Sequence, residues 1–245
     1  MIVTALATPI TYEQKSPSNK KGRDLVLALD ASGSMGESGF DAEKKELRKF
    51  DVVVSVLNDF IDKRADDNMG VVVFGTFAFA SVPLTYDTNA LKYVMHFLDV
   101  GIAGDNTAIG EAIEQSNRVL NVGDASKKVI ILLSDGFTNS GAISAKDAVK
   151  YSLKHNIKIY TIGLGKAGDY DEKLLKLIAK DSGGKFFKAQ NAEDLREVYT
   201  KLNSLEPSPI RSEHYLHKNL LFSIPLFIAI ALLVFMLLRR LGLKK

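Results

Sequence analysis

The sequence contains no cysteine and only four histidines. The absence of cysteine excludes disulfide bridges, zinc–thiolate sites and cysteine nucleophiles. The histidines (His96, His155, His214 and His217) are scattered along the chain, without the spacing of a metal-binding pair such as HExxH. A metal site based on histidine or cysteine is therefore not expected.

The chain has no region that concentrates positive charge, apart from its last seven positions. Four of the 32 basic residues lie there, which leaves 28 basic residues against 29 acidic ones for the rest of the chain. Nucleic-acid-binding domains usually carry a marked excess of Lys and Arg on one face. We therefore expect no nucleic-acid partner.

Motifs of the common nucleotide and hydrolytic sites are also missing. The sequence has neither a GxxxxGK[ST] phosphate loop nor a GxSxG nucleophile turn. A literal GxGxxG match occurs at residues 163–168. It follows a late predicted strand instead of the first one, and the next predicted strand ends without an acidic residue, so we do not expect it to bind a dinucleotide.

The order of the predicted elements indicates the fold class. Near-continuous apolar runs alternate with segments whose apolar residues recur every three or four positions. We expect strands at 24–30, within 69–84, and at 127–135, 157–165 and 184–189, and helices at 42–63, 88–98, 107–120, 143–155, 171–181 and 191–204. Such alternation predicts an α/β fold with a doubly wound, mostly parallel, Rossmann-like sheet and helices on both faces.

Residues 220–238 carry no charge over 19 positions. As a helix this run would reach about 28 Å, close to the thickness of a bilayer's hydrocarbon core, so it predicts one C-terminal transmembrane helix. It would divide the chain into an apolar stretch and polar linker (1–21), a domain (22–204), a juxtamembrane spacer (205–219), the membrane helix (220–238) and a basic tail (239–245).

The basic tail favours a cytoplasmic C-terminus in the inner membrane, with the domain in the periplasm of a Gram-negative cell. The first ten residues, MIVTALATPI, lack a basic start and are too short to span a bilayer. They fit a poor signal sequence, a strand or the remainder of a transmembrane helix, so a cytoplasmic domain stays an alternative.

Polar residues follow two predicted central strands at the point where each strand ends. Asp30 ends the first predicted strand and is followed by Ser32 and Ser34, while Asp135 ends the predicted strand at 127–135. Thr107 begins a predicted helix between them. Carboxyl ends of parallel strands share one edge of a sheet, so these oxygen groups can converge on a hard cation such as Mg²⁺ or Mn²⁺. Each of them alone could equally cap a helix.

The strings DASGS, DNTAIGEAI and SDG, in that order, resemble the metal-ion-dependent adhesion site (MIDAS) of von Willebrand factor type A (VWA) domains. DLVLALDASGSM, GVVVFGTFAF, KKVIILLSDG and IYTIGLG resemble, more narrowly, the bacterial aerotolerance (Bat) membrane proteins of the BatA type. The resemblance implies that Ser32, Ser34 and Thr107 coordinate the metal, and that Asp30 and Asp135 act directly or through water.

The resemblance also implies a function in binding, because a cation held largely by neutral hydroxyl groups attracts a further anion. A partner protein could supply it as a Glu or Asp side chain, with Phe40 and Phe137 as apolar contacts beside the metal. Other Bat proteins and a MoxR-type AAA+ ATPase are the partners that the resemblance suggests. We therefore expect a protein that is not an enzyme.

Two alternatives stay open. The same cation could activate water in a metal-dependent hydrolase, for which Asp105 and Glu37 are the nearby acids that could act as a base. The chain could also be a purely structural membrane subunit, in which the metal only makes the loops rigid.

Overall fold

The computed structural model describes residues 10–12, 22–64, 67–206, 218–220, 223–240 and 242. These residues fall into two compact units. One unit, Lys21–Ile210, contains the α/β domain, and the other is made of Met1–Lys20 together with Arg211–Lys245.

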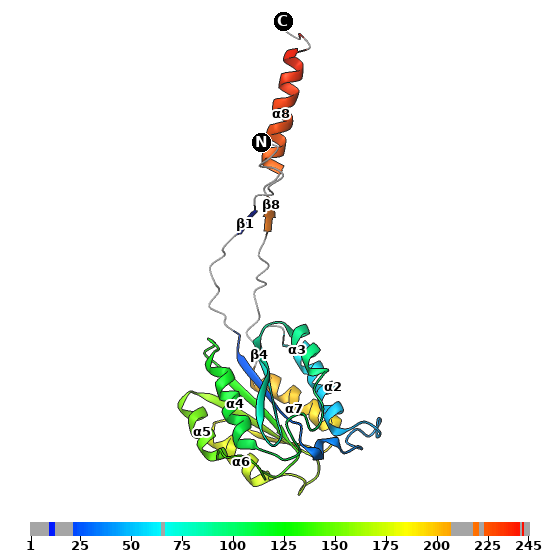
Figure 1. Cartoon of the computed structure of the whole chain (residues 1–245), viewed down its shortest axis with the longest axis vertical. Helices are drawn as coiled ribbons and strands as arrows, with labels where there is room; N and C mark the ends of the chain where they lie inside the picture. Colours follow the sequence, from blue (N-terminus) through cyan, green and yellow to red (C-terminus); the bar gives the residue numbers. More distant parts are fainter. Residues whose placement is uncertain are drawn as a thin grey trace. The chain divides into compact units, whose positions relative to one another are not determined.

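The domain is built on a six-stranded sheet (Figure 1). Across the sheet the strands are β4 (Ala78–Thr85), β3 (Asn68–Phe74), β2 (Asp24–Asp30), β5 (Lys128–Ser134), β6 (Ile157–Leu164) and β7 (Phe186–Ala189). All neighbours pair in parallel except β4, which runs antiparallel to β3 at one edge. The predicted fold class, a mostly parallel α/β sheet, is confirmed.

The central strand β2 separates two layers of hydrophobic core. Its alternate residues Leu25, Leu27 and Leu29 contribute to one layer, while Val26 and Ala28 contribute to the other. All seven residues of β2 are buried, as a strand covered on both faces requires. The sequence of β2 is almost continuously apolar because both of its faces are buried.

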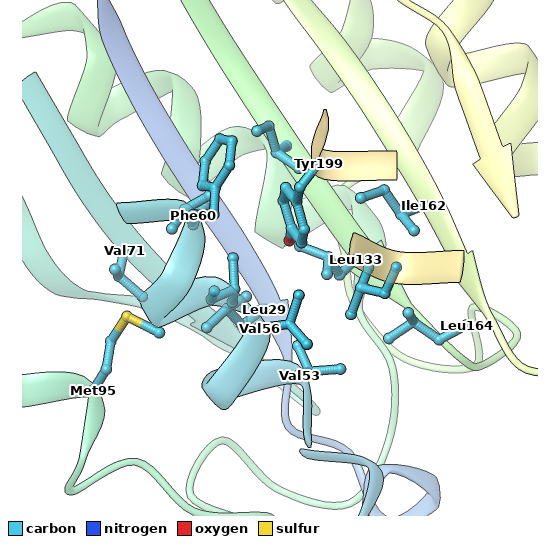
Figure 2. Packing of buried hydrophobic residues seen from close by; sticks show 14 of the residues in the cluster. Leu29, Val53, Val56, Phe60, Val71, Met95, Leu133, Ile162, Leu164 and Tyr199 are labelled. Atoms are coloured by element: carbon cyan, nitrogen blue, oxygen red, sulfur yellow. The ribbon is translucent and has the colours of Figure 1, made fainter. Parts of the chain in front are cut away.

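Helices α2 (Lys49–Asp62), α3 (Thr88–Met95) and α7 (Ala192–Leu205) cover the first layer. Figure 2 shows Phe60 of α2 and Tyr199 of α7 side by side over the sheet residues Leu29, Leu133 and Ile162, and their ring centroids are 4.5 Å apart. Helices α4 (Ile109–Asn121), α5 (Ala145–Lys154) and α6 (Glu172–Asp181) cover the second layer.

The first helix of the domain begins later than predicted. We expected a helix over 42–63, but α2 starts at Lys49. Before it, Asp41 accepts a hydrogen bond from the backbone N–H of Glu43, and Arg48 forms a β-bridge with Ser38. These local bonds hold the preceding segment in turns and fix the position at which the helix starts.

Buried charged side chains join the amino-terminal end of β2 to the end of α7. Arg23 pairs with Asp67 at 3.2 Å and lies 3.7 Å from Glu206, while Arg64 pairs with Asp67 at 2.8 Å. Glu206 also accepts hydrogen bonds from Lys158 and from the Tyr160 hydroxyl. The start and the end of the domain are therefore held together by one buried network.

In the second unit, strands β1 (Ile10–Tyr12) and β8 (Lys218–Leu220) pair antiparallel, and helix α8 spans Ser223–Arg240. Among the described residues, no helix reaches the combination of length and apolar character needed to cross a bilayer. Residues 221 and 222 of the predicted membrane segment, and most of the predicted spacer, lie outside the described residues.

Candidate metal centre

The predicted metal ligands lie where the winding of the sheet changes direction. From β2 the chain passes to β3 on one side, and it later returns to β5 on the other side. In such sheets the crevice outside the carboxyl ends of the two central strands is the usual place for a ligand. Asp30 ends β2, and Asp135 directly follows β5, so both carboxylates lie at this position.

Hydrogen bonds connect four of the five predicted residues. The Asp30 carboxylate accepts the Ser32 backbone N–H at 2.9 Å. The Ser32 and Ser34 hydroxyl oxygens are 3.2 Å apart, and the Ser34 hydroxyl donates to Asp135 Oδ1 at 2.6 Å. After β2 the chain enters the 3₁₀ turn Gly33–Gly36, which contains Ser34 and for which Ser32 is the N-cap residue.

Asp30 is fully buried, and burial raises its pKa to about 6. Hydrogen bonds from Ser134 and Ser32 oppose this shift, while the charge of Asp135 adds to it. The Ser134 hydroxyl donates to the second Asp30 oxygen at 2.7 Å. The protein thus keeps a carboxylate in a place where an added cation would stabilise its charged form.

Thr107, the fifth predicted residue, lies outside helix α4, which begins at Ile109. Asn139 fixes its backbone, because the Thr107 N–H donates to Asn139 Oδ1 at 2.8 Å and the Asn139 N–H donates to the Thr107 carbonyl. A Cβ atom on Gly136 would lie 2.8 Å from the Thr107 hydroxyl oxygen. The Thr107 side chain therefore lies directly against the residue that follows Asp135.

The structure places one further charged group at the centre that the sequence did not indicate. Lys49, the first residue of α2, lies with its ammonium 2.6 Å from Asp135 Oδ2 and 3.6 Å from Glu37. In the predicted helix 42–63 this lysine had no feature that distinguished it from a solvent-exposed residue. Ser134 and Asn139 were missed as well, although Ser134 belongs to the SDG string.

The loops around the centre carry exposed apolar side chains. Phe77, Ile102 and Phe137 are each about half exposed. The Phe77 N–H donates to the Ala103 carbonyl, so the loop after β3 and the loop before Thr107 are in contact. Phe40 is different: it is only 5% exposed and packs in the hydrophobic core, so its predicted role as a contact for a partner is wrong.

The donor set fits a hard divalent cation. All five predicted side chains offer oxygen, and the two carboxylates lie at the carboxyl ends of β2 and β5, which pair in the sheet. Within the described ranges, no three side chains of His, Cys, Asp or Glu form a group that could hold a metal. A site at this edge would therefore depend on the hydroxyl groups together with the two aspartates.

The acids that a hydrolytic reaction would need as a base are both exposed. Glu37 is 73% exposed and faces Lys49. Asp105 is exposed in the loop before Thr107, and its backbone carbonyl accepts the Gly33 N–H. Neither carboxylate forms a hydrogen bond to the serine or threonine hydroxyls of the centre.

Two bacterial relatives match most of this chain. An uncharacterised protein of Borreliella burgdorferi is 29% identical over 206 residues, which cover 84% of this chain and 59% of the relative. A UPF0353 protein of Mycolicibacterium paratuberculosis is 28% identical, with 83% of this chain and 66% of the relative covered. The chain therefore spans about three fifths to two thirds of the length of these relatives.

Solved structures share the fold. BatB from Bacteroides thetaiotaomicron has a TM-score of 0.62 at 21% identity, covering 75% of this chain and 98% of its own. An aerotolerance-related membrane protein of Bacteroides fragilis has a TM-score of 0.61 at 22% identity, covering 74% and 98%. Proximal thread matrix protein 1 of the mussel byssus, whose MIDAS motif was solved with zinc bound, has a TM-score of 0.62 at 21% identity, covering 83% and 49%.

A family model describes the domain itself. The model of the von Willebrand factor type A domain matches residues 24–201, from the first core strand to the last helix. This range contains the strand ends that carry Asp30 and Asp135 and the loop that carries Thr107. The chain belongs to the von Willebrand factor type A domain family.

Proposed function

We propose that the chain is a metal-dependent protein-interaction module, and not an enzyme. A divalent cation, Mg²⁺ or Mn²⁺, would be held by Ser32, Ser34 and Thr107, with Asp30 and Asp135 in direct or water-mediated contact. The observation that carries the proposal is the convergence of these oxygen groups at the ends of β2 and β5. The zinc-bound MIDAS motif of the mussel protein supports a metal at this position of the fold.

The charge of the centre supports an anionic partner group. Asp30 and Asp135 contribute two formal negative charges, and the buried Lys49 offsets one of them. With a divalent cation bound, the two aspartates at most balance its charge and the hydroxyl groups add none, so the cation would still attract an anionic oxygen. A Glu or Asp side chain of a partner would supply such an oxygen ligand.

The loops beside the cation support a protein as the source of this acid. Phe77, Ile102 and Phe137 expose apolar surface on loops that contact one another around the strand ends. Aromatic and aliphatic side chains of this kind commonly form the anchors of protein interfaces. A free small carboxylate would leave most of this surface uncovered.

We further propose that the uncharged run 220–238 attaches the chain to the inner membrane, with a periplasmic domain. Helix α8 contains residues 223–238 of this run and exposes large apolar side chains, including Phe227 at 72% and Met236 at 73%. The BatA-type assignment, and partnership with other Bat proteins and a MoxR-type AAA+ ATPase, are part of this proposal. Their support is the resemblance of the motifs and the shared fold.

The test is capture of the partner with and without metal. The full chain, purified from membranes of its own cells with Mg²⁺, should retain a partner that is lost in EDTA and in Thr107→Ala. Thr200→Ala, an exposed threonine on α7, is the matched control and should retain it. Changing the partner's critical Glu or Asp to the amide should weaken capture only when metal is present. A partner retained undiminished in EDTA would refute the proposed function.

A further inference from the structure

Lys49 has a burial and a set of contacts that an ordinary surface lysine lacks. Its side chain is 9% exposed, and its ammonium contacts Asp135, whose side chain is fully buried. We propose that Lys49 competes with the divalent cation for the Asp135 carboxylate. It holds this carboxylate while the metal is absent, gives it up when the cation binds, and so lowers the affinity of the centre for metal. The inference rests on the proposed function, because it takes the cation to bind among the five oxygen residues.

The local structure opposes a lysine at this position. Lys49 is the first residue of α2, where the helix dipole repels a positive charge, and burial removes water from its ammonium. The Arg48 cap residue provides no side-chain hydrogen bond to the helix end that would offset this cost. A buried ion pair seldom adds net stability compared with apolar residues, so stabilising the fold is a weak explanation for the lysine.

The geometry makes the competition direct. Asp135 Oδ1 accepts the Ser34 hydroxyl at 2.6 Å, and Oδ2 accepts the Lys49 ammonium at 2.6 Å. Each carboxylate oxygen therefore accepts one hydrogen bond from the protein and keeps a further lone pair. A cation that uses Asp135, directly or through water, would bind beside both of these donors. Of the two, the ammonium is the group that a dication repels.

A second acid allows Lys49 to move without leaving a buried charge unpaired. Glu37 Oε2 lies 3.6 Å from the same ammonium, and the Lys49 backbone N–H donates to the Glu37 carbonyl at 2.7 Å. Glu37 is 73% exposed, so a shift towards it carries the ammonium in the direction of water. The Lys49 ammonium therefore needs to move only a short distance to leave Asp135 and pair with Glu37.

The test measures Mn²⁺ binding to the full chain in detergent, by the electron paramagnetic resonance signal of free Mn²⁺. Lys49→Met should bind about tenfold tighter than the wild-type chain, because the competing charge is gone. Lys49→Arg keeps the charge and should bind as weakly as the wild-type chain. Lys45→Met removes the same charge from an exposed lysine four residues away and is the control that should leave the affinity unchanged.

Equal affinity in the wild-type chain, Lys49→Met and Lys45→Met would overturn the proposal. So would weaker binding by a folded Lys49→Met, since Lys49 would then help to form the site. Absence of Mn²⁺ binding in every form would refute the proposed function together with the role of Lys49. Equal or weaker binding by Lys49→Met would refute the role of Lys49 alone.

A measurement on the wild-type chain covers the case in which Lys49→Met does not fold. Acetic anhydride labelling, followed by peptide mass spectrometry, should show increased modification of Lys49 when Mg²⁺ is added, with Lys45 unchanged. Lys49 that stays equally protected with and without Mg²⁺, in a chain that binds the metal, would overturn the proposal.

Discussion

At the scale of single residues, close packing between Gly136 and Thr107 holds the threonine hydroxyl beside the Asp135 loop. A methyl group on Gly136 would lie 2.8 Å from the Thr107 hydroxyl oxygen and must push it away. We therefore predict that Gly136→Ala weakens Mn²⁺ binding by about tenfold, in the range of a lost ligand-positioning contact. Titration calorimetry measures this directly.

Gly33→Ala is the matched control for this prediction, because Gly33 lies within the DASGS string. A Cβ atom there would have no neighbour closer than 3.8 Å, so the variant should bind metal as the wild-type chain does. An equal effect of both substitutions would contradict the packing argument, since it would point to the loss of glycine flexibility instead.

Sequence reasoning could identify the oxygen donors but not all of the groups that hold them. Asp30, Ser32, Ser34 and Asp135 lie at or just after strand ends, and the position of a strand end can be read from its apolar run. Lys49 has no such signal, because its contact with Asp135 joins residues 86 positions apart. Its burial depends on the residue at which α2 starts, and local periodicity defines that residue poorly.

At the scale of elements, the end of α7 is joined to the sheet through Glu206. Burial raises the pKa of Glu206, but hydrogen bonds from Lys158 and Tyr160, with the charges of Lys158 and Arg23, outweigh burial and lower it below its usual value. A carboxyl group with a lowered pKa stabilises the fold above its unfolded pKa, and this contribution is lost as the pH falls through the folded value.

We predict that Glu206→Gln lowers the free energy of unfolding by about 3 kcal/mol at neutral pH, because it breaks a buried charged network. The difference from the wild-type chain should shrink as the pH falls below 4.5, the ordinary value for Glu. Urea unfolding at a series of pH values measures it. Glu197→Gln, which removes an exposed pair with Lys201 on the same helix, should change stability by less than about 0.5 kcal/mol. A Glu206→Gln effect that is independent of pH would contradict the assignment.

Most elements of the fold could be predicted because the sheet is covered on both faces. Double burial produces the apolar runs of β2 and β5, and the helices between them show their periodicity. The predicted helix over 42–63 is wrong for residues 42–48. Leu47 packs on the core and continues the helical spacing of α2, although it lies before the helix. The same limit applies to Phe40: a loop residue gives no sign in the sequence of whether it faces the core or a partner.

At the scale of the whole molecule, the proposed membrane attachment and its orientation lead to one prediction. Protease added to spheroplasts should digest the domain, because four basic residues after position 238 favour a cytoplasmic tail. A cytoplasmic protein serves as the control for intact spheroplasts and should be protected. Protection of the domain under the same conditions would place it in the cytoplasm and refute the periplasmic assignment.

The central claim is that the oxygen groups at the ends of β2 and β5 bind a divalent cation. Titration calorimetry of the full chain with Mn²⁺ should show one site in the wild-type chain and none in Asp30→Asn, with circular dichroism unchanged. Asp30→Asn retains the shape of the side chain but removes the buried charge that attracts the cation. Asp105→Asn, an exposed acid in the neighbouring loop, should bind as the wild-type chain does. Equal affinity of the wild-type chain and Asp30→Asn would contradict the account.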